Sequence, residues 1–197
     1  MPIPIMPMLL HSTDSPPTGE DWIHQVKWDG LRCLFVVNEQ GFHIWSRHNR
    51  EMTAEFPEFK SLVFKHTLIL DGELVVIHKG TVSLSRVRKR AFTSNQSTTK
   101  LLSTSFPAHY MAFDILRVND EDVYRRPLTE RFSLLQETIM SSEFLTVTDT
   151  FDDGDALFAS TKELGWEGVV SKRRGSVYQP GKRSWDWLKA RHTWKHT

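Results

Sequence analysis

The 197-residue sequence is poor in cysteine. Cys33 is the only one, so no intramolecular disulfide can form. A chain without disulfides is typical of a reducing compartment, and we expect a cytoplasmic protein. Cys33 directly precedes the apolar residues 34–37, which favours a buried strand position over a reactive thiol.

The sequence also lacks a long apolar segment. The first ten residues are apolar, but they contain three prolines and no Lys or Arg, which argues against a signal peptide and a membrane-spanning helix. There is no repeat and no low-complexity tract, and 39% hydrophobic residues are enough for a core. Length and composition predict one globular domain, a monomer with no membrane partner.

The chain has almost no net charge, at +1, but its charges are unevenly distributed. Residues 171–197 hold eight Lys or Arg and one acid, Asp186. A second basic cluster lies in residues 86–90. Local basic patches on a neutral chain indicate a polyanion bound at a defined place, although any single cluster is more often a solvated face.

Short apolar runs separated by turns predict more strands than helices. The expected strands, after an extended segment at 22–26, are residues 31–37, 42–47, 68–70, 74–77, 109–116, 167–172 and 185–191, with Asp71-Gly72-Glu73 as a tight turn. The expected helices are residues 55–64, 128–140 and 155–164, and residues 83–90 are helical or irregular. Strands in hairpins with inserted helices predict an α+β fold, with antiparallel β-sheets flanked by helices.

Charged residues interrupt these strands again and again. Such residues are seldom buried unless they are paired or bind a ligand. Cations can neutralise phosphates, carboxylates can hold a divalent metal, and a lysine among other cations has a lowered pKa and can act as a nucleophile. The pattern therefore indicates nucleotide or phosphate chemistry with Mg²⁺. These residues are Lys27, Asp29, Arg32, Arg47, Asp71, Glu73, Asp114, Glu167, Lys172, Lys189 and Arg191.

Six short segments resemble, in order, the motifs of covalent nucleotidyltransferases, the superfamily of DNA ligases, RNA ligases and mRNA capping enzymes. The first, Lys27-Trp28-Asp29-Gly30, resembles the Lys-x-Asp-Gly signature, a weak match alone. The other five are Ser46-Arg47, Asp71-Gly72-Glu73-Leu74, Ala112-Phe113-Asp114-Ile115-Leu116, Glu167-Gly168-Val169-Val170-Ser171-Lys172 and Trp187-Leu188-Lys189-Ala190-Arg191. The probability that six motifs agree in order by chance is very small.

The N-terminal approach is more specific. Pro7-Met8-Leu9 and the segment from Pro16 to Trp22 are similar to the ligase domain of bacterial end-joining DNA ligases. The resemblance covers nearly the whole chain. It implies that residues 1–197 form the nucleotidyltransferase (adenylation) domain of an ATP-dependent DNA ligase, working in the bacterial cytoplasm or nucleoid.

The resemblance also implies roles for individual residues. Lys27 would attack the α-phosphate of ATP and form lysyl-AMP, with Mg²⁺ or Mn²⁺, and AMP would then pass to a 5′-phosphate at a nick or break in double-stranded DNA. Asp71 and Glu167 would hold the metal. The residues expected to bind the nucleotide or the 5′-phosphate are Gln25, Arg32, Arg47, Glu73, Phe113, Lys172, Lys189 and Arg191.

Several of these residues have a structural alternative. Phe113 stacks on adenine or is an ordinary core residue, and Asp29 acts in the chemistry or fixes the turn before Gly30. For Trp185 and Trp187, core packing is favoured over stacking on DNA. The nine histidines show no spacing typical of a metal site.

The sequence departs from the family pattern in four places. Gln25 replaces the usual Glu, Asn49 replaces a Gly, and Arg191 replaces a Lys. The sequence ends six residues after Arg191, so the family's C-terminal oligonucleotide-binding (OB) fold domain is expected to be absent and nick sealing by this chain alone to be weak. Other repair domains of a longer protein would be partners.

Two other functions stay open at this point. An RNA ligase or a GTP-using capping enzyme would share the same motifs, and the Trp187-Leu188-Lys189 ending favours a DNA ligase over them. A non-catalytic module that binds DNA ends would share the fold. The presence of Lys27, Glu73 and Glu167 argues against that module.

Overall fold

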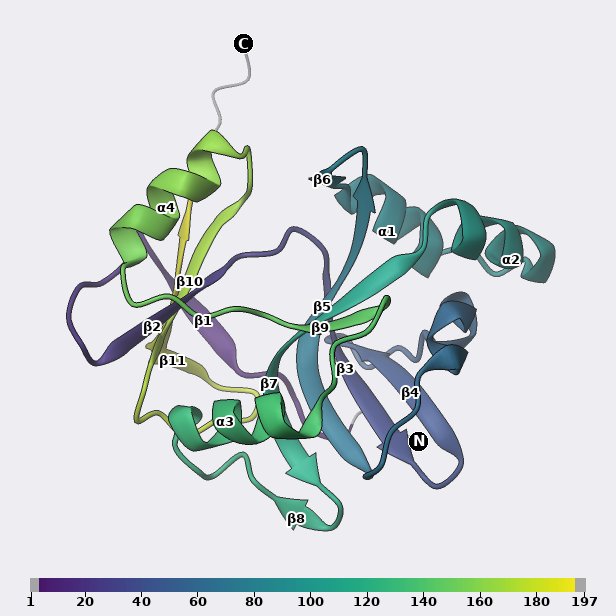
Figure 1. Cartoon of the computed structure of the whole chain (residues 1–197), viewed down its shortest axis with the longest axis horizontal. Helices are drawn as coiled ribbons and strands as arrows, with labels where there is room; N and C mark the ends of the chain where they lie inside the picture. Colours follow the sequence, from purple (N-terminus) through teal and green to yellow (C-terminus); the bar gives the residue numbers. More distant parts are fainter. Residues whose placement is uncertain (1–3, 194–197) are drawn as a thin grey trace.

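The structure, a computed structural model, describes residues 4–193. Lys195, counted above in the basic C-terminal stretch, lies outside the described residues. Two β-sheets lie next to each other, with α4 beside the smaller sheet and α1 and α2 beside the larger one (Figure 1). This arrangement confirms the predicted α+β fold with mainly antiparallel sheets.

The smaller sheet has the strand order β1-β11-β10-β2. Its strands are β1 Leu9–Thr13, β2 Trp22–Val26, β10 Gly168–Arg173 and β11 Arg183–Arg191. β10 pairs antiparallel with both neighbours and places Lys172 opposite Trp187 and Val170 opposite Gln25. The first strand, β1, runs parallel to the last, β11, so the two ends of the chain meet in one sheet.

The larger sheet has seven strands and the main path β4-β3-β5-β7-β8. Its strands are β3 Leu31–Asn38, β4 Gly41–Ser46, β5 Leu68–His78, β6 Thr81–Val82, β7 Ala108–Val118, β8 Glu121–Asp122 and β9 Leu145–Val147. β9 pairs parallel with β7, and all other pairs are antiparallel. The two parallel pairs, one in each sheet, were not predicted, since each joins segments far apart in the sequence.

Four α-helices in the described part of the chain flank the sheets. They are α1 Leu84–Ala91, α2 Gln96–Ser105, α3 Leu128–Thr138 and α4 Gly154–Glu163. Residues 83–90, for which the sequence left a helix or an irregular segment open, lie almost entirely in the helix α1. α2 was missed because it is rich in Ser and Thr, and its start is set by Asn95, whose side chain accepts a hydrogen bond from the Thr98 backbone N–H.

The predicted helix at residues 55–64 is wrong. Two short 3₁₀ helices, Thr53–Glu55 and Pro57–Ser61, take its place. Phe56, Phe59 and Leu62 recur every three residues, which matches the 3₁₀ repeat better than the α repeat. Phe56 and Phe59 are fully buried.

The predicted tight turn at residues 71–73 is also wrong. β5 runs through it without a break, with only a shift of register against β7 between Asp71 and Gly72. A Cβ atom at Gly72 would lie 2.5 Å from Cζ of Tyr110. This glycine therefore allows a close approach of the Tyr110 ring, one of the uses of glycine inside a strand.

Two apolar clusters form the core. The larger lies on the seven-stranded sheet and includes Phe35 and Tyr110. The smaller joins the two sheets and includes Met8, Tyr178 and Trp187, with Phe113 packed at its edge. This second cluster fixes the orientation of one sheet against the other. Among residues 4–193, no helix is both long and apolar enough to cross a membrane.

The prediction that both C-terminal tryptophans pack in the core is half right. Trp187 is 1% exposed, but Trp185 is 69% exposed. Trp185 lies where the register between β1 and β11 shifts, and its ring stacks on His11 at 3.9 Å between centroids. The irregular pairing turns Trp185 outward, which simple alternation along a strand does not predict.

Candidate functional site

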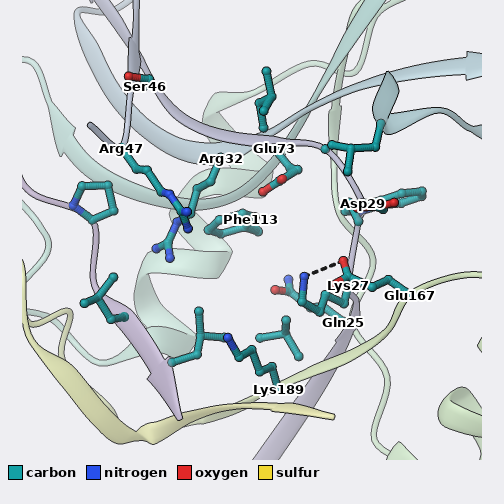
Figure 2. A pocket seen from close by; sticks show the side chains of 18 of the residues that line it. Gln25, Lys27, Asp29, Arg32, Ser46, Arg47, Glu73, Phe113, Glu167 and Lys189 are labelled. Atoms are coloured by element: carbon teal, nitrogen blue, oxygen red, sulfur yellow. Dashed lines mark hydrogen bonds and ion pairs between the residues drawn. The ribbon is translucent and has the colours of Figure 1, made fainter. Parts of the chain in front are cut away.

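A cavity of about 1010 Å³ lies between the two sheets, and ten of the eleven site residues predicted from the sequence line it. Figure 2 shows Lys27 and Glu167 on one side, Arg32 and Arg47 on the other, and Phe113 between them. The ten residues are Gln25, Lys27, Arg32, Arg47, Glu73, Phe113, Glu167, Lys172, Lys189 and Arg191. The eleventh, Asp71, does not line the cavity.

Lys27 and Glu167 form an ion pair at the centre of one wall. Nζ of Lys27 donates to Oε2 of Glu167 at 2.6 Å, and the two side chains are 22% and 24% exposed. Lys27 directly follows β2 and Glu167 directly precedes β10, and the Lys27 backbone N–H bonds the Gly168 carbonyl at 2.9 Å. The pairing of these strands therefore sets the amine beside the carboxylate, where a ligand can reach both.

Gly30 lets the chain turn sharply after Lys27. A Cβ atom at this position would lie 2.1 Å from the carbonyl oxygen of Leu74. Only glycine permits this close contact between the turn and β5. Asp29, for which the sequence left two roles open, lines the cavity beside it.

Asp71, which the resemblance implies as a metal ligand, does not line the cavity. Asp71 is fully buried, its carboxylate accepts two hydrogen bonds from Arg32 at 2.7 and 3.1 Å, and it accepts a third from the Tyr178 hydroxyl at 2.6 Å. These bonds engage both oxygens of the carboxylate. Asp71 therefore fixes the guanidinium of Arg32, which itself lines the cavity.

Phe113 lies at the cavity surface and rests on buried cations. The amine of Lys172 is 4.3 Å from the Phe113 ring centroid and 4.2 Å from that of Trp187, and it donates to the Phe113 carbonyl at 3.2 Å. The Arg32 guanidinium lies 5.4 Å from the Phe113 centroid. Phe113 is half-buried, and so it is available for stacking on a flat ligand while its backbone is held in place.

Burial shifts the pKa of three charged groups in the cavity. It raises the pKa of Glu73 to about 8, although Lys27 and Arg32 oppose the shift. It lowers the pKa of Lys172 to about 7, against the attraction of Asp114 and Asp71. The pKa of Lys189 is lowered by burial and by the nearby Arg191 and Lys27. Burial thus disfavours the charged form of each of these three side chains.

The lowered pKa of Lys172 predicts a pH-dependent stability. Between a pH of about 7 and the ordinary lysine pKa of 10.5, the Lys172 amine is protonated in the unfolded chain and neutral in the folded chain. The contribution of Lys172 to the free energy of unfolding therefore increases as pH rises through this range. Replacing Lys172→Met removes that gain. Urea unfolding of both proteins should show that the free energy of unfolding of the wild type, relative to that of Lys172→Met, increases from pH 7 upward. Lys65→Met, at an exposed lysine, is the control, and a pH-independent difference for Lys172→Met would refute the prediction.

Two substitutions against the family pattern fit their surroundings. Asn49 has a φ of +61°, in the left-handed region that asparagine tolerates. Gln25 is buried, and its Nε2 has no hydrogen-bond partner among the described residues. A buried donor without a partner is costly, and because Gln25 lines the cavity this donor is available to a ligand acceptor.

The carboxylates that line the cavity are Asp29, Glu73 and Glu167. No group of three metal-ligating side chains occurs within residues 4–193. Mg²⁺ binds through one or two carboxylates together with substrate phosphates, so it needs no complete protein cage. The donor set present fits a metal brought with a nucleotide and does not fit a resident structural metal.

Sequence reasoning missed several residues that line or support the site. Tyr178 bridges Asp71 and the Met8 backbone N–H, and Arg50, Arg88, Phe92 and Arg183 line the cavity. Arg88 and Arg183 belonged to the basic clusters noted in the sequence. Nothing in the local sequence pattern around Tyr178 or Phe92 indicated their positions.

Comparisons with known proteins agree with this geometry. The model of the family described as "ATP dependent DNA ligase domain" matches residues 7–191. A DNA ligase-like protein, LigB, from the SPbeta prophage of Bacillus subtilis is 32% identical over 186 residues, which are 94% of this chain and 66% of LigB. The multifunctional non-homologous end joining DNA repair protein LigD of Mycobacterium tuberculosis is 33% identical over 194 residues, which are 95% of this chain and 24% of LigD.

A solved structure of mycobacterial DNA ligase D in complex with ATP and MES superposes with a TM-score of 0.79 at 30% identity. The match covers 95% of this chain and 60% of that one. The chain thus spans only part of the length of these relatives. Since the family model covers nearly all of it and the cavity gathers the residues of its motifs, the chain belongs to the ATP-dependent DNA ligase domain family.

Proposed function

We propose that this chain takes AMP from ATP onto Lys27 and passes it to a DNA 5′-phosphate. The observation that carries the proposal is the Lys27 amine, held by Glu167 at 2.6 Å inside a cavity lined by cations. The Nζ atom, once it has lost a proton, attacks the α-phosphorus. An N–P bond forms and the P–O bond to the leaving pyrophosphate breaks. Lys189 and Arg191 neutralise charge on the transferred group.

The nucleoside has a place on the remaining walls. Phe113 offers its ring to the adenine, and the unpartnered Nε2 of Gln25 donates to an acceptor on the base. Glu73 hydrogen-bonds a ribose hydroxyl, and its raised pKa limits repulsion toward phosphates. These contacts orient the α-phosphate toward Lys27.

Mg²⁺ or Mn²⁺ fits the cavity through Glu167, with substrate phosphates completing its coordination. When bound, the metal lowers the repulsion between the phosphates and the developing charge. Glu167 would hold the metal, and its ion pair with Lys27 keeps the nucleophile beside that carboxylate. We assign the metal no contact with Asp71, because the oxygens of Asp71 accept from Arg32 and Tyr178.

The acceptor in the proposal is a nick or break in double-stranded DNA. Arg47 is exposed at the rim of the cavity and suits a 5′-phosphate. We further propose that residues 1–197 act as one adenylation domain that needs an OB-fold or other repair domain for efficient sealing, in the bacterial cytoplasm or nucleoid. A relative named as a non-homologous end joining DNA repair protein supports this proposal.

The preference for ATP over GTP distinguishes the proposed function from that of a capping-type enzyme. Incubation with α-labelled ATP and Mg²⁺ should give covalently labelled protein, and α-labelled GTP at the same concentration should give at most about a tenth of the label. Chelation of the metal should remove the label. Equal labelling by GTP, or labelling that survives chelation, would contradict the proposal. Failure of both nucleotides would favour a non-catalytic DNA-binding module.

A further inference from the structure

The cavity extends beyond the residues that the nucleotide needs. Its volume of about 1010 Å³ is at the upper end of the roughly 300–1,000 Å³ of small-ligand pockets. The extension, which we name the α1 arm, is lined by Arg47, His48 and Arg50 after β4 and by Arg88 and Phe92 at the end of α1. It is continuous with the part that holds Lys27.

The four basic side chains of α1 have different surroundings. Arg90 is buried and bonds both carboxylate oxygens of Glu58, so it is structural. Arg86 lies over the Phe106 ring at 4.9 Å. Lys89 is exposed and does not line the cavity. Arg88 is exposed, lines the cavity and has no carboxylate partner within residues 4–193, so its charge is available to a ligand.

Phe92 stands beside Arg88 with 74% of its side chain exposed. The Arg50 guanidinium lies 5.0 Å from the centre of its ring. Arg50 is itself fixed by Glu55, at 2.7 Å, and by the carbonyl of Ala91. The end of α1 is therefore anchored, and Phe92 presents a ring that lies against the Arg50 guanidinium and leaves most of its surface to solvent.

We propose that the α1 arm binds the DNA strand that leads away from the adenylation site, with Arg47 and Arg88 on its phosphates and Phe92 against a base. This inference rests on the proposed function. A groove of cations that contains an exposed aromatic ring is the recurring way in which proteins hold an unpaired strand or a strand end, because every base has a flat face. Among the described residues, no acidic one lines the arm, although Glu55 pairs with Arg50 from outside it. The remaining positive charge suits a polyanion.

A flat ring gains most from a base whose face is open. At a nick the flanking bases cover each other, whereas a break or a frayed end leaves a base face uncovered. The arm therefore favours a strand end over an intact duplex. An acidic peptide would satisfy the cations equally well but would gain nothing from stacking on Phe92.

The test is binding of fluorescent DNA, measured by anisotropy at low salt. The probe is a 5′-phosphorylated duplex with a short single-stranded end. Phe92→Ala should weaken binding by about tenfold. Arg88→Ala should weaken it by about threefold and reduce the salt slope by about 0.9. On a duplex closed by a hairpin at each end, Phe92→Ala should change the logarithm of the dissociation constant by less than half as much as on the probe with a single-stranded end.

One matched control lies on α1 and the other on α2. Lys89→Ala removes the same charge one residue from Arg88, and Leu101→Ala removes an apolar side chain that is 65% exposed on α2, away from the cavity. Both should leave the affinity for DNA within about twofold. All four positions are exposed, so the variants should fold.

If Arg88→Ala and Lys89→Ala lowered the affinity for DNA equally, the effect would come from overall charge alone, and the proposal would be overturned. So would an unchanged affinity for Phe92→Ala, absence of DNA binding by the wild type, or equal competition by polyglutamate. The label from ATP at Lys27 is measured on the wild-type preparation alongside. Absence of that label would count against the proposed function, whereas the α1 arm is judged by DNA affinity alone.

Discussion

Replacing Lys27 with arginine is expected to lower covalent transfer of AMP to the protein by at least about a thousandfold. Arginine keeps the positive charge and can still pair with Glu167, which Lys27 contacts at 2.6 Å. Its guanidinium stays protonated at any usable pH, so it offers no free electron pair to the α-phosphorus. The measurement is the initial rate of labelling from α-labelled ATP.

The comparison needs a matched lysine and an independent measure of ATP binding. Lys65→Arg makes the same change at an exposed position outside the cavity and should label at the wild-type rate. ATP binding by Lys27→Arg, measured by calorimetry, should stay within about fivefold, because most contacts to the nucleotide come from other residues. Labelling of Lys27→Arg at more than a tenth of the wild-type rate would show that another group is the nucleophile.

Asp114→Asn is expected to lower the free energy of unfolding by about 3–5 kcal/mol. Both carboxylate oxygens of Asp114 accept from Arg131, at 2.8 and 2.9 Å, and neither side chain is exposed. The substitution leaves the Arg131 charge buried without its counter-ion. Arg131 also donates to the carbonyl of Ser176, so the change reaches the segment that carries Tyr178.

The same strand provides the control. Arg117 and Asp122 form an ion pair at 2.6 Å with side chains 41% and 38% exposed, and an exposed pair contributes at most about 1 kcal/mol. Urea unfolding of Asp122→Asn should therefore differ little from the wild type. A loss below about 1.5 kcal/mol for Asp114→Asn would mean that solvent or another acid compensates the buried arginine.

Local sequence pattern predicted most strands and the main helices because alternation and capping act over a few residues. It failed where a contact distant in sequence decides the local structure. Gly72 looked like a turn residue, but it makes room for Tyr110, 38 positions later in the sequence. The parallel pairing of β1 with β11 depends on the whole fold and has no local signature.

The candidate site was more predictable than the fold details, because six ordered segments resemble family motifs that carry the site residues. Ten of the eleven predicted residues line one cavity. Asp71 is the exception: a carboxylate in a motif can bind a metal or fix an arginine, and its contacts with Arg32 and Tyr178 favour the second role. Phe92 and Trp185 were not assigned to the surface, since exposure of a single aromatic residue depends on packing.

The central claim is that AMP is held covalently on Lys27, and mass spectrometry tests it most directly. Wild-type protein is incubated with ATP and Mg²⁺, its intact mass is measured, and the modified peptide is sequenced under non-acidic conditions that preserve an N–P bond. We predict one AMP per chain, attached to Nζ of Lys27. No adduct, or an adduct on another residue such as Lys189, would contradict the account.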